Sequence, residues 1–288
     1  MVLSFRKGSD PLNFDLRADA KKKLMLVAHR GAFAGNIPCN TIAAYEAALR
    51  QGADMIEIDL NYTADGKLVV FHPTMERQHL GFVGNINEYD WNFVKQLRYI
   101  NVDRGQTQFG INTLDEVLEQ FKGRCYINID KFWLKPKEIS EVVRRHGMTD
   151  QILGKTSVKP QYLDIVEKYC PDIPYMAIVK KEEEIAIARA RKINYIGTEV
   201  LFREDTSPLC SPEFIESHHK DGLLVWCNSI VYNYRDVLAG GHCDDRAFLG
   251  DPEGSWGWIA DRGFDLMQTD HTLEAALFLE KTGRRKRG

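Results

Sequence analysis

The sequence predicts an α/β fold, a closed (β/α)8 TIM barrel with a β-hairpin after its second strand and an insertion over its C-terminal face. Apolar runs of strand length alternate with segments of helical spacing, and eight such runs follow one another along 288 residues. No glycine-rich phosphate-binding motif follows the first run, which disfavours the alternative, a doubly wound open sheet. We expect an N-terminal extension over 1–23 and one barrel domain over 24–288.

The composition argues against several classes of protein. Lysine and arginine number 38 against 41 acidic residues, and this mildly acidic balance does not indicate nucleic-acid binding. The six cysteines include no CxxC pair, a usage typical of reduced cytosolic proteins. No signal-like apolar segment opens the chain and no run reaches the ~20 residues of a transmembrane helix. We therefore expect a cytoplasmic protein that acts on a small molecule.

The expected strands have similar lengths and are apolar almost throughout, as strands buried on both faces are. They lie at 24–29, 55–60, 125–130, 151–156, 173–179, 193–200, 223–228 and 264–270. A helical pattern follows each of them; the first, TIAAYEAALRQG, is expected to be capped by Asn40, and the last is TLEAALFLE.

A further apolar run, 67–72, lies close behind the second strand, and only TADG separates it from Tyr62. A parallel crossover needs a dozen or more residues, so this run must return antiparallel. A two-residue Asp-Gly turn at 65–66 would place His72 opposite Asp59. Because directly opposed residues share a face, and alternate residues do too, His72 would then converge on Asp59 and Glu57. A slip of one residue would undo this arrangement.

The stretch 78–112 stands outside the strand–helix alternation and carries several aromatic residues. We interpret it as an insertion over the mouth of the barrel. It is either a lid or substrate wall, or a packed excursion that covers hydrophobic surface.

Ionisable residues end many of the apolar runs. In a (β/α)8 barrel these ends meet on one face, where the chemistry collects. Glu57 and Asp59 lie in one apolar strand and Asp130 ends the next, and buried carboxylates need a cation or strong donors. An ion pair is the simpler explanation; a divalent metal site is the functional one. Ligands that are all oxygen favour Mg²⁺ or Ca²⁺ over zinc.

Two histidines accompany these carboxylates, His29 at the end of the first strand and His72 on the return strand. Imidazole titrates near neutral pH, so the two suit a general acid and a general base. Arg30 suits bidentate capture of a phosphate. A divalent cation, an arginine and two histidines together indicate phosphoryl chemistry on an anionic substrate.

Residues 27–72, from AHRG to VVFH, resemble the opening of the glycerophosphodiester phosphodiesterase family. The resemblance continues more weakly through INTLDEVL, NIDK, LLVWCN and FDLMQTD, so it spans most of the chain. It implies a (β/α)8 barrel, one divalent cation and a glycerophosphodiester substrate from lipid metabolism. It also implies roles for seven residues: catalytic His29 and His72, metal-binding Glu57, Asp59 and Asp130, phosphate-binding Arg30 and substrate-wall Trp226.

Two positions depart from the family pattern. The second family histidine is usually followed by Asp, whereas Pro73 follows His72 here. The third metal ligand is usually a Glu with a Lys two residues later, whereas Lys131 follows Asp130 directly. Lys131 should therefore point to the opposite face of its strand unless a bulge re-aims it. Lys155, at the end of the next strand, is the other candidate for the phosphate-binding cation.

The resemblance implies hydrolysis of a glycerophosphodiester to glycerol 3-phosphate and an alcohol, with the two histidines as general acid and base. Two alternatives remain open. One is a related barrel lyase, like the phospholipase D toxins, that releases a cyclic phosphate. The other is a non-catalytic barrel that binds a phosphodiester.

Overall fold

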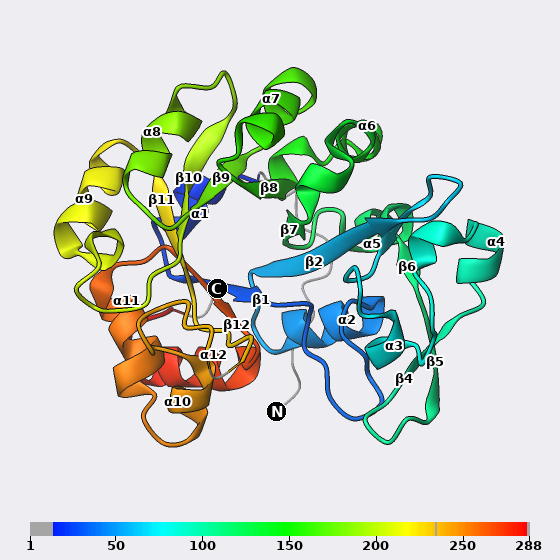
Figure 1. The fold of residues 1–288 in the computed structure, drawn as a ribbon. Helices are drawn as coiled ribbons and strands as arrows, with labels where there is room; N and C mark the ends of the chain where they lie inside the picture. Colours follow the sequence, from blue (N-terminus) through cyan, green and yellow to red (C-terminus); the bar gives the residue numbers. More distant parts are fainter. Residues whose placement is uncertain (1–13, 234, 287–288) are drawn as a thin grey trace.

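The computed structural model describes residues 14–233 and 235–286, and its central element is a closed barrel of eight parallel strands. The barrel closes because β1 pairs in parallel with both β12 and β2 (Figure 1). The predicted (β/α)8 barrel is confirmed, and all eight expected strands form. They are β1 (Met25–Ala28), β2 (Met55–Tyr62), β7 (Tyr126–Asp130), β8 (Ile152–Ser157), β9 (Tyr175–Val179), β10 (Tyr195–Val200), β11 (Leu224–Asn228) and β12 (Leu266–Thr269).

Helices cover the outside of the barrel (Figure 1). Those that follow barrel strands are α2 (Ile42–Arg50), α5 (Leu114–Phe121), α6 (Pro136–His146), α7 (Pro160–Tyr169), α8 (Glu183–Arg189), α9 (Pro212–Lys220), α10 (Asp244–Phe248), α11 (Trp258–Arg262) and α12 (Thr272–Lys281). Local sequence explains where several of these helices begin. Thr113 and Glu116 form a capping box at the N-terminus of α5, and proline is the first residue of α6, α7 and α9. The predicted cap of α2 is wrong by one residue, because Thr41 rather than Asn40 accepts the Ala44 amide.

Alternate strand residues divide between two apolar layers, as the period of two requires. Leu26, Ile56 and Ile58 belong to the large layer between strands and helices. Met25, Val27 and Met55 belong to a smaller cluster that fills the barrel interior. Because both faces are buried, the strands are apolar almost throughout, and this is the pattern that predicts the fold.

The described part of the predicted N-terminal extension packs against the barrel. Helix α1 (Leu16–Ala20) places Leu16 and Ala20 in the interior cluster, beside the first residues of the strands. The Arg17 guanidinium donates to the carbonyl oxygen of Tyr195 over 2.8 Å. This helix therefore closes the N-terminal end of the barrel. Residues 1–13 of the predicted extension lie outside the described residues.

The hairpin after β2 forms, but its predicted register is wrong by one residue. β3 (Leu68–Val70) runs antiparallel to β2, and Asn61 pairs with Val69. Thr63 accepts a hydrogen bond from Gly66 and donates one to Lys67, which makes a loop of three residues, 64–66. Gly66 has φ +82, the left-handed conformation that such a loop needs. Asp59 therefore lies opposite Phe71, not His72.

The insertion packs beside the hairpin. It contains α3 (Glu76–His79), η1 (Ile86–Glu88), α4 (Trp91–Val94), the antiparallel pair β4 (Arg98–Ile100) and β5 (Gln106–Gly110), and β6 (Asn112–Thr113), which pairs with β3. Seven buried residues form a cluster between insertion and hairpin: Val69, Phe71, Leu80, Ile86, Val94, Tyr99 and Ile111. Figure 1 shows these elements to one side of the barrel, so the packed excursion is the better description.

Two further findings concern the cysteines and the possibility of a membrane-spanning helix. All six cysteines are described, and each is a free thiol. Within 14–233 and 235–286, no helix is both long and apolar enough to cross a membrane.

The role of α1 can be tested with Leu16→Ala. Leu16 is 4% exposed, so the lost contacts should lower the free energy of unfolding by about 2–4 kcal/mol. Urea unfolding measures this. The control is Leu277→Ala on α12, where the side chain is 58% exposed and the change should stay within about 0.5 kcal/mol. Equal losses in the two variants would contradict a closing role for α1.

Candidate active site

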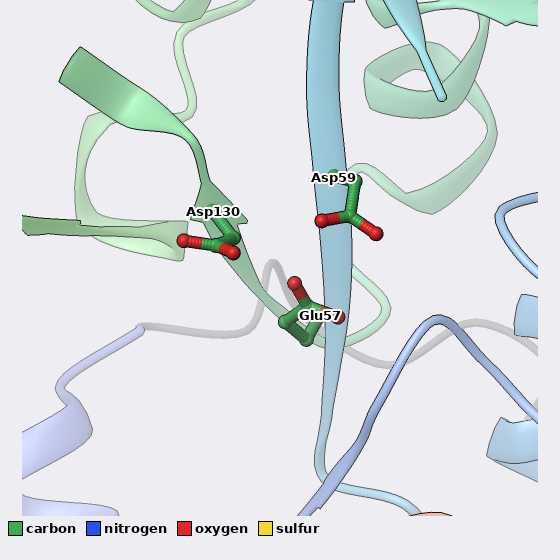
Figure 2. Close-up of side chains that lie close together, drawn as sticks. All are labelled: Glu57, Asp59 and Asp130. Carbon is green, nitrogen blue, oxygen red and sulfur yellow. The ribbon is translucent and has the colours of Figure 1, made fainter. Parts of the chain in front are cut away.

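Three carboxylates meet at the C-terminal end of the barrel (Figure 2). Glu57 and Asp59 are two residues apart on β2 and therefore point to the same face, into the barrel. The parallel register pairs Asp59 with Asp130, the last residue of β7. Each of the three residues offers an oxygen within 4.8 Å of the others. The predicted carboxylate cluster is thus brought together by strand register.

One oxygen of each carboxylate on β2 is fixed by a neighbour. The Asn40 amide donates to Asp59 Oδ2 over 2.8 Å, and Arg30 Nε lies 2.8 Å from the same oxygen. The Arg30 backbone N–H donates to Glu57 Oε2 over 2.9 Å. The sequence predicts Asn40 only as a helix cap; because Thr41 is the cap, the Asn40 side chain is available to Asp59.

The remaining oxygens fit a divalent cation. Asp59 Oδ1 is buried and has no hydrogen-bond donor among the described residues. Burial, followed by the charge of Asp59, raises the pKa of Glu57 to about 7. A bound divalent cation would favour the ionised form of these groups. The donors are oxygens only, which is the ligand set of Mg²⁺ or Ca²⁺.

His29 follows β1 and lies on one side of the cluster. Its Nδ1 is 2.8 Å from Asp270 Oδ1, so the imidazole is oriented by a carboxylate. Burial disfavours the charged imidazole, but the hydrogen bond to Asp270 and the negative charge of Glu57 outweigh burial and raise the pKa of His29. The sequence places Asp270 at the end of the last strand, and the structure shows its partner.

His72 reaches the same cluster by a different route from the one predicted. β3 ends at Val70, so His72 is released from strand alternation and its Nε2 lies 3.9 Å from Asp59 Oδ1. The Met75 amide donates to the His72 carbonyl, and this turn has Pro73 second and Thr74 third with φ +70, the pattern of a type II turn.

The turn also supplies a partner for the imidazole ring of His72. His72 Nδ1 lies 2.7 Å from the carbonyl oxygen of Pro73 and donates to it. Nε2 is then the unprotonated nitrogen of the neutral ring. Burial chiefly lowers the pKa of His72, and the positive charges of Arg30 and Lys131 lower it further.

Lys131 points toward the carboxylates, contrary to the strand alternation. It has φ +59, and this left-handed residue, rather than a bulge, turns the side chain back. Its Nζ lies 2.5 Å from Asp130 Oδ2 and 3.6 Å from Asp59 Oδ1. Burial opposes ionisation of Asp130, but Lys131 and Lys155 outweigh it and lower the pKa of that carboxyl.

Lys155 forms an ion pair with a different carboxylate, that of Glu199. Its Nζ is 2.6 Å from Glu199 Oε2 and 3.7 Å from the centre of the Trp226 ring, and its side chain is 4% exposed. Trp226 is fully buried in the barrel interior, where its indole N–H donates to Asn228. The structure thus places Trp226 beneath Lys155 and not among the residues that line the cavity described next.

A cavity of about 670 Å³ opens above the carboxylates. Most of the predicted site residues line it, together with several to which the sequence assigns no role, and no residue of 78–112 does so. The predicted residues are His29, Arg30, Glu57, His72, Asp130, Lys131 and Lys155; among the others are Phe33, Met75, Glu199, Val231, Tyr232, Asp236 and Asp270. Phe33 and Tyr232 are exposed aromatics on loops, where no periodic pattern marks them.

Comparisons with known proteins agree with this geometry. The glycerophosphodiester phosphodiesterase of Bacillus subtilis (strain 168) is 34% identical over 188 residues, 58% of this chain and 64% of that protein. The enzyme of the same name from Caldanaerobacter subterraneus is 40% identical over 112 residues, 38% of this chain and 45% of its own. The chain therefore spans less than two thirds of the length of either relative.

Solved structures share the fold. A glycerophosphoryl diester phosphodiesterase from Parabacteroides distasonis superimposes with a TM-score of 0.73 at 19% identity and covers 91% of this chain and 87% of its own. A phosphodiesterase from Oleispira antarctica, solved with the product sn-glycerol-3-phosphate, gives a TM-score of 0.64 at 20% identity and covers 89% and 96%.

The family assignment rests on the length of the match as well as on the site. The model of the Glycerophosphoryl diester phosphodiesterase family matches residues 29–273, a range that begins at the first candidate histidine and contains all three carboxylates. This chain belongs to the glycerophosphoryl diester phosphodiesterase family.

Proposed function

We propose that this protein is a metal-dependent phosphodiesterase that hydrolyses a glycerophosphodiester to glycerol 3-phosphate and an alcohol. The observation that carries the proposal is that His29 and His72 line one cavity with Glu57 and Asp130, each ring anchored through Nδ1. The Oleispira neighbour, whose product is sn-glycerol-3-phosphate, supports the same product here. The free cysteines support a reducing compartment such as the cytoplasm.

One divalent cation, Mg²⁺ or Ca²⁺, would be held by Glu57, Asp59 and Asp130. When bound, it would stabilise negative charge on the phosphoryl oxygens. Asn40 and Arg30 would keep Asp59 oriented for this role, because both contact its second oxygen.

The two histidines would move the protons. In the first step the glycerol 2-hydroxyl oxygen attacks phosphorus, the bond from phosphorus to the alcohol oxygen breaks, and a cyclic phosphate forms. His72, neutral with Nε2 free, takes the hydroxyl proton. His29, whose protonated form Asp270 favours, donates a proton to the leaving alcohol. Water then opens the cyclic phosphate with the two roles reversed.

Lys131 is the better candidate for the phosphate-binding cation. It reaches the cavity beside Asp130, and its side chain is 21% exposed. Lys155 is enclosed by Glu199 and Trp226 and would instead support Asp130 through its charge.

Alanine variants of the two histidines test the proposal. Loss of either proton-transfer group should lower kcat by about 10²–10⁴-fold without changing the melting temperature. The assay follows release of glycerol 3-phosphate from glycerophosphocholine with Mg²⁺ or Ca²⁺, and EDTA should abolish it. The control is His219→Ala, since His219 pairs with Asp265 away from the cavity.

Full activity in His29→Ala or His72→Ala would overturn the proton-transfer roles. Phosphorus NMR of the first product separates the alternatives. A cyclic phosphate that persists would identify a lyase, and absence of turnover on every glycerophosphodiester with either metal would identify a binding barrel.

Asp270→Asn tests the acid role of His29 through pH. Asp270 raises the pKa of His29, so the protonated acid form persists above the ordinary value of ~6.5 and is lost as pH rises further. Removing the carboxylate should move the alkaline limb of kcat/KM to lower pH and leave the acidic limb in place. An unmoved alkaline limb would contradict the assignment.

Methionine variants separate the two lysines. Lys131→Met should lower kcat/KM by about tenfold or more and cost less stability than Lys155→Met, because the Lys131 side chain is 21% exposed. Lys155→Met leaves Glu199 buried without its cation, so the free energy of unfolding should fall by about 3 kcal/mol. Substrate kinetics and urea unfolding of both variants measure these effects. The opposite ranking would show that Lys155 is the phosphate ligand.

A further inference from the structure

Asp244, the first residue of α10, has a buried carboxylate. It forms no ion pair with any residue of 14–233 or 235–286. It is 2% exposed and accepts four hydrogen bonds instead. Its Oδ1 accepts from Ser229 Oγ over 2.5 Å, Trp256 Nε1 over 2.7 Å and Thr269 Oγ1 over 2.8 Å. Its Oδ2 accepts from the Asp270 backbone N–H over 2.8 Å. Both carboxylate oxygens thus accept hydrogen bonds, and Oδ2 accepts only from Asp270.

The donors come from separate parts of the chain. Ser229 directly follows β11, Thr269 ends β12, and Trp256 lies in the π-helical segment η5 (Glu253–Gly257). The Asp244 backbone N–H also donates to the carbonyl of Ser229 over 2.7 Å. Asp244 therefore joins the ends of two neighbouring barrel strands, both next to the cavity.

Two of these residues, Thr269 and Asp270, form hydrogen bonds with His29. The carbonyl of Thr269 accepts the His29 backbone N–H over 3.1 Å, and the side chain of Asp270 binds His29 Nδ1 over 2.8 Å. The backbone and the ring of His29 are thus both attached to residues that Asp244 holds. This chain of contacts leads from a carboxylate outside the cavity lining to a proposed catalytic group.

We propose that Asp244 is a positioning residue for His29: its carboxylate fixes Thr269 and Asp270, and these fix the backbone and the imidazole of His29. The inference rests on the proposed function, in which His29 donates a proton to the leaving alcohol. Asp244 touches neither the substrate cavity nor the reacting atoms.

The role requires a carboxylate rather than an amide. All four partners are donors, so an Asn at this position would aim its own N–H groups at one of them. Three donors surround Oδ1, and the amide oxygen should remain there. The amide nitrogen would then face the Asp270 N–H and displace it. Burial raises the pKa of Asp244 to about 6 against the effect of these hydrogen bonds, so assays at pH 8 keep it ionised.

Kinetics of Asp244→Asn test the proposal at pH 8. Loss of a partner behind a functional group typically costs about 10–100-fold in activity, and we expect this in kcat with little change in KM. In the double variant with Asp270→Asn, the Asp244 change should cost less than about threefold, because its effect passes through Asp270. Losses that multiply independently would overturn the proposal.

The matched control is Asp265→Asn. Asp265 is also a buried aspartate before β12, and its Oδ2 accepts the Val225 N–H over 2.7 Å. It lies at the opposite end of the strand from Asp270. This variant should lose stability but keep kcat. A similar fall of kcat in both variants would mean that Asp244 acts only through general stability.

A second readout does not depend on turnover. With ¹⁵N-labelled histidine, the Nδ1 signal of His29, assigned by its loss in His29→Asn, should shift in Asp244→Asn and stay in place in Asp265→Asn. An unshifted signal would overturn the positioning role. If no glycerophosphodiester is turned over but the signal shifts, the proposed function fails and the positioning role stands.

Thr269→Val serves if Asp244→Asn does not fold. It keeps the shape of the side chain and removes one hydrogen bond to Asp244 and the acceptor of the His271 N–H. The His29 signal should shift in the same direction, with a loss of kcat of about two- to fivefold. An unchanged signal in this folded variant would contradict the proposal.

Discussion

The close approach of three carboxylates, two of them buried, is the constraint on which the rest of this site depends. The register of β2 and β7 places Asp59 beside Asp130, and the period of two adds Glu57 to the same face. Burial and the nearby charge of Asp59 both raise the pKa of Glu57. At Asp130 burial is outweighed by Lys131 and Lys155, which lower the pKa of that carboxyl. Arg30, Asn40 and Lys131 contact these carboxylates, and a divalent cation would neutralise the negative charge that they leave uncompensated.

The arrangement depends on unusual backbone at three residues. Arg30, Asn40 and Lys131 have φ of +56, +55 and +59, which costs non-glycine residues roughly 1 kcal/mol or more each. Each left-handed residue places a side chain against a carboxylate: Arg30 and Asn40 reach Asp59, and Lys131 reaches Asp130. Charge-assisted contacts offset the strain, so the carboxylate cluster and the distorted backbone stabilise one another.

The parts of this site that follow from strand periodicity can be predicted from the sequence. The positions of side chains that depend on the conformation of a single turn cannot. The barrel, the two carboxylates of β2 and the strand-end position of His29 follow from apolar runs. The hairpin register was missed because Asp-Gly also fits a three-residue loop with Gly66 left-handed. The predicted direction of the Lys131 side chain is wrong for a similar reason, since alternation holds only while the strand continues and β7 ends at Asp130. His72 reaches its predicted neighbour although the register that predicted this is wrong.

Because Pro73 rather than an acidic residue follows His72, the two histidines have different hydrogen-bond partners. Both rings are anchored through Nδ1, but His29 binds a carboxylate and His72 binds a carbonyl oxygen. A carboxylate stabilises the imidazolium, whereas a neutral carbonyl fixes the tautomer and adds no charge. The burial that both share is thus outweighed at His29 only, and their pKa values move apart. The proposed acid and base need such a difference, and it comes from the carboxylates beside His29 and from the burial and the cations Arg30 and Lys131 beside His72.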